Sequence, residues 1–186
     1  SAAAQWQVIY ASQTGYAYEL AQQTVQMLQT AGHSACCISM DQLTPQQLAG
    51  SRCLIIASTT GEGDPPDPAL AFIGHTAIAT DLRDTRYAIL ALGDRSYEHF
   101  CAFAHQLDHW LRNSGANPLF DVIEVDNADP TALQQWQQHI ATLTGQHNPT
   151  IWEARHYSTW TLSTRQHLNP GSQGGAVFHL ELRPDN

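Results

Sequence analysis

Short apolar runs alternate along this chain with stretches in which apolar residues recur every three or four positions. The runs are typical of strands buried on both faces, and the longer stretches are typical of helices that pack on a sheet. We predict a short helical turn at 45–48 between the regular elements. The predicted strands cover residues 6–11, 34–40, 52–58, 86–93 and 119–125, and the predicted helices cover residues 18–31, 68–79, 101–114 and 130–143.

This regular alternation of strand and helix predicts an α/β fold, a doubly wound parallel sheet with helices on both faces. In such sheets a ligand binds outside the carboxyl ends of the strands, where the strand order reverses. Polar loops follow three of the predicted strands, 6–11, 52–58 and 86–93. We therefore expect these three loops to meet at one site.

The first of these loops, residues 12–17, turns directly into a helix, and such a helix start binds anions through its unpaired N–H groups and its dipole. Ser12 and Thr14 add hydroxyl donors, and Gly15 allows a close approach of the backbone. The loop that holds nucleoside triphosphates needs a lysine, and this chain has none. A ligand with a single phosphate fits better, although the loop alone is also compatible with an ordinary turn.

Residues from about 145 onward break the pattern. Two strand-like runs, 157–166 and 176–182, flank a glycine-rich stretch and predict antiparallel β-structure. Because two strands alone are barely stable in water, we interpret them as the truncated start of a further β-rich domain. The predicted organisation is a first domain at 1–145, a linker at 146–156 and the start of a second domain at 157–186.

The composition of the chain limits the kinds of molecule that it is expected to bind. With 8 basic and 17 acidic residues the formal net charge is −9, which argues against nucleic acid or an anionic membrane surface and leaves room for a protein with a basic patch. The four cysteines form no C-x-x-C pair and are interpreted as buried free thiols. The scattered histidines lack metal-ligand spacing, and no signal peptide or membrane-spanning segment is recognised.

The residues of the three loops resemble those of a known family. Ser12–Ala17, Ser58–Pro65 and Leu92–Cys101 are similar to the flavin loops of the flavodoxin-like domain in diflavin reductases, which include the sulfite reductase flavoprotein subunit and cytochrome P450 reductase. The resemblance covers about residues 5–144 and implies a five-stranded parallel sheet in the order 2-1-3-4-5. Residues 160–182 look like the opening strands of the FAD-binding barrel in those reductases.

The resemblance implies a site for FMN. Tyr97 is expected to stack on the isoalloxazine ring. The Gly61 carbonyl is expected to accept a hydrogen bond from a protonated flavin N5, through a peptide that glycine allows to flip. Asp126 lies where relatives have an acidic residue near the ring. The phosphate would be held by Ser12, Gln13, Thr14, Gly15, Tyr16 and Ala17, one edge of the ring by Ser58, Thr59, Thr60 and Gly61, and the other side by Leu92, Gly93, Asp94, Arg95, Ser96, Tyr97, Glu98, His99, Phe100 and Cys101.

Two positions depart from the family pattern. Tyr16 stands where asparagine is usual, and Thr60 stands where relatives have glutamine or a second stacking tyrosine. These departures bear on affinity and potential rather than on the existence of the site. The acidic residues around the loops are expected to face a basic patch on an electron acceptor; they are Glu62, Asp64, Asp67, Asp94 and Glu98.

The function that the resemblance implies is that of an FMN domain in a cytoplasmic or membrane-tethered NADPH-dependent diflavin oxidoreductase. It would pass single electrons from FAD, in the reductase domain of the same polypeptide, to a metal-containing acceptor such as sulfite reductase or another haem protein. The residues present carry no NADPH site, so this part alone would be an electron carrier. The alternatives are a free-standing flavodoxin-type carrier with an extension, and an interaction module that has the fold without the flavin.

Overall fold

The computed structural model describes residues 5–12, 14–146, 160–171 and 175–184, and it divides into two compact units, Ser1–Trp152 and Glu153–Asn186. The first unit is built on one parallel sheet in which the strand order is β2-β1-β3-β4, with both β5 and β6 paired to β4. The predicted order 2-1-3-4-5 is confirmed, with two short strands sharing the last position. The strands are β1 Trp6–Ala11, β2 Ala35–Ser39, β3 Arg52–Ser58, β4 Arg86–Gly93, β5 Asn117–Pro118 and β6 Ile123–Asp126.

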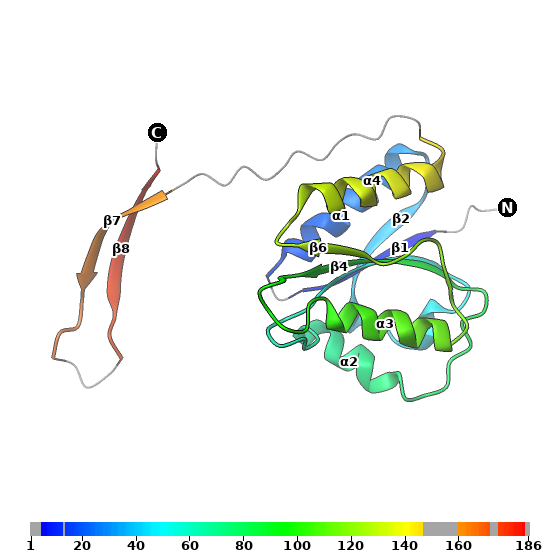
Figure 1. The fold of residues 1–186 in the computed structure, drawn as a ribbon, viewed down its shortest axis with the longest axis horizontal. Coiled ribbons are helices and arrows are strands. Elements are labelled where there is room, and N and C mark those ends of the chain that lie inside the picture. Colours follow the sequence, from blue (N-terminus) through cyan, green and yellow to red (C-terminus); the bar gives the residue numbers. More distant parts are fainter. Residues whose placement is uncertain (1–4, 13, 147–159, 172–174, 185–186) are drawn as a thin grey trace. The chain divides into compact units, whose positions relative to one another are not determined.

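Helices cover both faces of this sheet, as Figure 1 shows. The helices α1 (Tyr16–Thr30) and α4 (Pro130–Thr144) lie on one face, and α2 (Asp67–His75) and α3 (Ala102–Asn113) lie on the other. Two short 3₁₀ helices, η1 (Met40–Gln42) and η2 (Pro45–Leu48), connect β2 to β3.

Two hydrophobic clusters result, one on each face of the sheet. Ile55 of β3 and Phe103 of α3 belong to the first cluster, whereas Leu54 of β3 and Trp136 of α4 belong to the second. Neighbouring residues of a strand point to opposite faces, so the continuous apolar run in β3 supplies both clusters. This double burial explains why its bounds were predictable.

The predicted strand 119–125 is wrong in its first half. Regular pairing with β4 begins only at Ile123. The ring of Phe120 stacks on His139 with centroids 4.2 Å apart and packs edge-on against Trp136 at 5.6 Å. Leu119 and Phe120 pack against the cluster under α1 and α4, whereas Val122 packs against the cluster on the other face of the sheet. The apolar residues of 119–122 are thus packed without forming a strand.

Two helix bounds differ from the prediction by two residues or more, and the other shifts are of a single residue. Helix α1 begins at Tyr16, two residues earlier than expected, because Gly15 takes the left-handed conformation with φ 80° at its N-cap. Helix α2 ends at His75, four residues before the predicted end. Side chains satisfy the carbonyls of its last turn: Nδ1 of His75 lies 2.7 Å from the Ala71 oxygen, and the Thr76 hydroxyl donates to Ile73 O at 2.7 Å.

The second unit contains an antiparallel pair, β7 (Trp160–His167) and β8 (Phe178–Pro184). The predicted antiparallel strands are thus confirmed, with Leu162 opposite Leu182 and an irregularity between Leu162 and Thr164. Every residue of β8 is exposed. The predicted linker at 146–156 lies outside the described residues except for Gln146. That this unit begins an FAD-binding barrel stays a prediction.

Candidate functional site

The register of the parallel strands brings the three predicted loops to one edge of the sheet. Ala11 of β1 is level with Ala57 of β3, Ser58 of β3 with Leu92 of β4, and Gly93 of β4 with Asp126 of β6. The loops that follow these residues therefore leave the sheet side by side. This edge is the carboxyl edge on which ligands bind in doubly wound sheets.

The first loop presents a helix start without a capping side chain. Gly15 is the N-cap residue of α1 and has no side-chain oxygen to offer to the first turn. The Ser12 hydroxyl accepts a hydrogen bond from the Thr14 N–H at 3.2 Å and lies 3.4 Å from the Thr14 hydroxyl. Thr14 and Gly15 are exposed, so the hydroxyls and the dipole end of α1 are placed together for an anion.

Tyr16 and Ala17 of this loop were expected to hold the phosphate, but their side chains pack in or against the core. The side chain of Ala17 is buried in the cluster under α1, and Tyr16 packs against the same cluster. A ligand phosphate could therefore meet Ala17 only through its backbone. Gln13 lies outside the described residues.

The second loop is a tight turn joined to the neighbouring strand. Its Thr59 N–H donates to Leu92 O at 3.0 Å, and Thr60 and Asp64 exchange backbone hydrogen bonds of 2.9 and 3.0 Å. Gly61, at the exposed tip, has φ 44°, and a Cβ built there would meet no other atom within 4 Å. The backbone at Gly61 is therefore open to a ligand.

A buried hydroxyl at the base of the second loop has no protein partner. The Thr59 Oγ1 atom is inaccessible to solvent and forms no hydrogen bond with the described residues. Leaving such a group unpaired costs about 1–3 kcal/mol, and buried polar atoms are normally paired. Two other such atoms among the described residues, in Trp6 and Gln7, belong to the first two residues of β1, at the opposite edge of the sheet. Thr59 is thus a polar group at the carboxyl edge that a ligand could satisfy.

Gly63 joins the second loop to the third and was not among the predicted site residues. It is buried with φ 105°, and a Cβ there would lie 2.6 Å from Cβ of His99 and 3.1 Å from Cβ of Ala102. Only glycine allows this approach. The second glycine of the Gly61-Glu62-Gly63 sequence was the available signal.

The third loop is held in shape by Asp94. Its carboxylate accepts hydrogen bonds from the Ser96 hydroxyl at 2.6 Å and the Ser96 N–H at 2.8 Å, and these bonds lower the pKa of Asp94. The Tyr97 N–H donates to Asp94 O at 3.2 Å. The Tyr97 side chain is left 47% exposed, as a ring that stacks on a planar ligand requires.

The two ends of the third loop are part of the core. Leu92 is buried in the cluster under α1 and α4, and Cys101 is fully buried. The Cys101 thiol donates to Ala91 O at 3.5 Å, and burial is the main cause that raises its pKa to about 12. Cys101 is therefore an unreactive packing residue, and the ligand contacts predicted for Leu92 and Cys101 could come only from their backbones.

Asp126, the last residue of β6, lies beside this loop. Its Oδ1 accepts the Arg95 N–H at 3.0 Å, and its Oδ2 lies 3.8 Å from Arg95 Nε. The Arg95 guanidinium also lies 3.6 Å from Glu124 and 4.5 Å from the centre of the Phe100 ring. Glu124 was missed because nothing in the sequence pairs it with Arg95.

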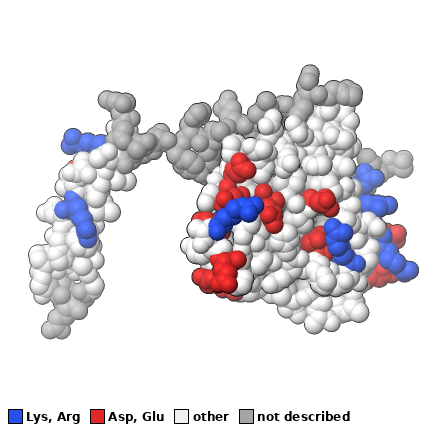
Figure 2. Space-filling view, viewed as in Figure 1, with Lys and Arg blue, Asp and Glu red and all other residues white. Residues whose placement is uncertain are grey.

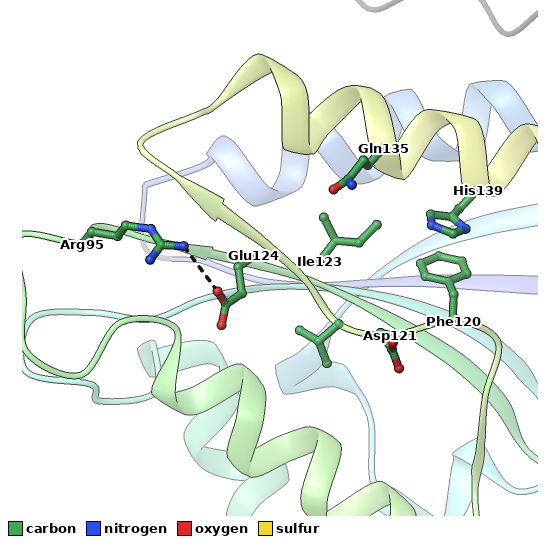
Figure 3. Close-up of a pocket in the computed structure, with 8 residues that line it drawn as sticks. Arg95, Phe120, Asp121, Ile123, Glu124, Gln135 and His139 are labelled. Atoms are coloured by element: carbon green, nitrogen blue, oxygen red, sulfur yellow. Dashed lines mark ion pairs between the residues drawn. The ribbon is translucent and has the colours of Figure 1, made fainter.

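A hollow of about 580 Å³ lies outside β6 rather than between the loops (Figure 3). In Figure 3 Gln135 and His139 approach it from α4, and Glu124 points away from α4 toward Arg95. Of the predicted site residues only Arg95 lines it. Its lining consists of Arg95, Phe120, Asp121, Val122, Ile123, Glu124, Gln135 and His139.

Charge differs between the two edges of the sheet. Arg52 and Arg86 begin β3 and β4, at the edge opposite the loops. In Figure 2 acidic side chains gather around a single basic side chain at the left end of the first unit, the end at which Figure 1 shows β4 leading into α3. The loop edge is therefore acidic apart from Arg95.

The sheet order, the helices on both faces and the polar loops at one carboxyl edge define a flavodoxin-like α/β domain. A family model described as Flavodoxin matches residues 8–138, and the chain belongs to the flavodoxin family. The resemblance to this kind of domain is thereby confirmed.

Curated relatives extend the match. The sulfite reductase [NADPH] flavoprotein alpha-component of Bacillus subtilis is 36% identical over 136 residues, which are 72% of this chain and 22% of the relative. The protein of the same name from Vibrio cholerae is 32% identical over 198 residues, covering 94% of this chain and 32% of the relative. The chain thus spans between about a fifth and a third of the length of these relatives.

Solved structures share the fold. The Streptococcus pneumonia TIGR4 flavodoxin superposes with a TM-score of 0.68 at 22% identity, covering 76% of this chain and 99% of that one. Flavodoxin 1 from Bacillus cereus gives 0.64 at 20% identity, covering 75% and 98%. Within the described ranges, no helix has the length and apolar composition that a membrane crossing needs.

Proposed function

We propose that the first unit binds FMN at the carboxyl edge of its sheet and acts as an electron-transfer domain. The observation that carries the proposal is the meeting of three different loops at this edge, one with an anion-binding helix start, one with an unpaired hydroxyl and one with an exposed aromatic ring. When bound, FMN takes up and releases electrons, and the protein binds it, orients it and sets its potential.

The described residues fit such a cofactor. Ser12, Thr14 and the N-terminal end of α1 suit the phosphate, because they combine hydroxyl groups with the positive end of a helix. Thr59 supplies a hydroxyl that needs a partner, and the exposed Gly61 backbone leaves room for the ring edge. Tyr97 is exposed enough to stack. We propose that the other residues of the segments 12–17, 58–61 and 92–101 contact the cofactor mainly through their backbones.

We further propose that this domain works within an NADPH-dependent diflavin reductase. The Vibrio cholerae relative matches 94% of this chain, well beyond the family match at residues 8–138. The solved flavodoxins are matched almost over their full length by about three quarters of the chain, so the β7–β8 unit is additional to a free flavodoxin. We propose that it belongs to an FAD-binding domain, and that electrons pass from NADPH through FAD to FMN.

The acidic loop edge suggests how an electron acceptor is recognised. Glu62, Asp64, Asp67 and Glu98 are all exposed on the second loop, the start of α2 and the third loop. Negative charge around a redox site speeds docking of a partner with a basic patch. The relatives are named as components of sulfite reductase, and we propose as acceptor a cytoplasmic, metal-containing protein such as a sulfite reductase haemoprotein.

Cofactor binding is tested by titrating the purified, flavin-stripped protein into FMN and following FMN fluorescence, with riboflavin and FAD as comparison ligands. The proposal predicts saturable quenching by a protein that turns yellow, with riboflavin binding at least tenfold more weakly because it lacks the phosphate. Binding of riboflavin as tight as that of FMN would remove the role of Ser12–Ala17. A protein that binds neither would instead support an interaction module without flavin.

A further inference from the structure

The Arg95 side chain is held by two carboxylates of the edge strand β6 and by the ring of Phe100 in its own loop. The guanidinium lies 3.6 Å from the Glu124 carboxylate, 3.8 Å from the Asp126 carboxylate and 4.5 Å from the centre of the Phe100 ring. Glu124 and Asp126 are two residues apart on a strand, so they project from the same face of the sheet. The guanidinium therefore bridges two neighbouring carboxylates.

Asp126 also holds the backbone of the loop. Its Oδ1 accepts the Arg95 N–H at 3.0 Å, and the Asn127 N–H donates to Gly93 O at 3.0 Å. The segment from Gly93 to Arg95 is thus fastened to the end of β6 by one side chain and one backbone bond. A carboxylate that accepts an N–H forms one of the stronger kinds of hydrogen bond.

Glu124 is itself fixed from the helix that follows the loop. The Nε2 atom of His105, in α3, lies 2.6 Å from Glu124 Oε1, while the other oxygen of Glu124 faces Arg95. The two ends of the third loop, Arg95 at its start and α3 at its end, therefore meet at one carboxylate of β6. This arrangement restrains the segment that carries Tyr97.

We propose that Arg95 is a positioning residue, and that Glu124 and Asp126 of β6 hold it so that the 94–100 loop keeps its shape at the cofactor site. The expected effect of this positioning on FMN binding rests on the proposed function. It changes the role first expected for Arg95, from a direct cofactor contact to an indirect one. It also gives a role to Glu124, which the sequence did not indicate.

The test compares Arg95→Gln, Glu124→Gln and the double variant by FMN titration. Each single variant is expected to weaken FMN binding about threefold to tenfold, because the pair is partly exposed. The double variant should be no weaker than the singles, which is the signature of two residues acting through one interaction. Raising the ionic strength should reduce the difference between wild type and Arg95→Gln.

Arg83→Gln is the matched control. Arg83 forms an exposed ion pair with Asp81 at 2.6 Å, and it precedes β4 at the opposite edge of the sheet from the site. The substitution removes the same charge and one ion pair, and FMN binding should stay at the wild-type level. If Arg95 acted by contacting FMN directly, Arg95→Gln would weaken FMN binding without speeding amide exchange within residues 94–100, and the proposal would be overturned.

Amide hydrogen exchange of the FMN-free protein separates this inference from the proposed function. Arg95→Gln and Glu124→Gln should both speed exchange within residues 94–100, by at least threefold, while Arg83→Gln should not. Unchanged exchange in both loop variants would overturn the positioning role even if wild type binds FMN. Faster exchange in both loop variants, together with a wild type that fails to bind FMN, would sustain the positioning role and reject the cofactor.

Discussion

Two threonines at opposite edges of the sheet show how differently these edges are built. Thr85, just before β4, is fully buried, and its hydroxyl donates to Leu48 O at 2.7 Å. Thr59, just after β3, has a buried hydroxyl for which the described residues provide no partner. The first hydroxyl is used by the fold, whereas the second is left without a partner at the edge where we propose that the ligand binds.

Backbone strain also differs between the two edges of the sheet. The non-glycine residues with positive φ in the described ranges are Cys101 at 55°, Asn127 at 47° and Ala128 at 60°. All three follow the carboxyl ends of β4 or β6. A left-handed conformation costs about 1–2 kcal/mol for such residues, and strain of this kind collects at functional sites. The carboxyl edge thus gives up stability where the proposed site lies.

Gly63→Ala should produce the largest effect. The new Cβ would lie 2.6 Å from Cβ of His99 at a residue with φ 105°, so strain and overpacking together should cost about 2–4 kcal/mol. Urea unfolding of the flavin-free protein measures this loss, and FMN binding should weaken because the second and third loops separate. Gly74→Ala is the control, since a Cβ there meets nothing within 4 Å. Wild-type stability of Gly63→Ala would contradict the tight packing of these loops.

Thr85→Val comes next and should affect stability alone. The substitution removes one buried hydrogen bond, while Leu48 O keeps the Ser51 N–H at 3.1 Å and the Ser51 hydroxyl at 2.7 Å as donors. The loss should therefore cost about 0.5–1.5 kcal/mol of unfolding free energy. The FMN dissociation constant of the folded protein should not change, because Thr85 lies at the edge remote from the loops. If Thr85→Val lost much FMN affinity but no stability, the roles that we assign to the two edges of the sheet would be wrong.

Thr59→Val is the counterpart and should have the opposite outcome. Removing an unpaired buried hydroxyl should leave the unfolding free energy of the flavin-free protein unchanged or raise it by up to about 1 kcal/mol. FMN binding should weaken about tenfold, which corresponds to roughly 1.4 kcal/mol, if the cofactor supplies the missing partner. Destabilisation of the flavin-free protein with unchanged FMN affinity would show that Thr59 has no ligand-binding role.

The smallest expected effect is a dependence of the order of the 94–100 loop on pH, through Asp94. Hydrogen bonds from Ser96 lower the pKa of Asp94 in the folded protein, so its contribution to stability is present above the unfolded pKa of about 4 and is lost as the pH falls through the lower folded value. Wild type should therefore hold the 94–100 loop better than Asp94→Asn near neutral pH, and the difference should shrink below about pH 4. Amide exchange or peak intensities of Ser96 and Tyr97 measure it. A difference that grows toward acid pH would contradict this sign.

The sequence predicted best those parts in which burial alone decides the structure. The bounds of β3 and β4 were correct because their apolar runs are buried on both faces. Residues 119–122 were predicted wrongly because the sequence does not reveal the stacking of Phe120 on His139, a residue of α4 far along the chain. The predicted end of α2 was wrong because side chains of His75 and Thr76 bind the carbonyls of its last turn.

The candidate site shows the same limits. The three loops could be found because each follows a strand end and carries a motif of its own. The unpaired state of the Thr59 hydroxyl, the contact of Gly63 with His99 and the contact of Arg95 with Glu124 depend on distances between segments, so the residue pattern did not contain them. Sequence thus indicated which loops form the site, and the structure adds how their side chains are used.

The central claim is that ligand binding belongs to the carboxyl edge of the sheet. Its most direct test is a map of backbone amide chemical shifts of the whole chain with and without FMN. We expect the largest changes in chemical shift within residues 14–17, 58–63 and 93–101, and none at Thr85 and its neighbours. Changes centred instead on residues 119–124 and 135–139 would place the ligand in the hollow beside β6 and contradict the claim.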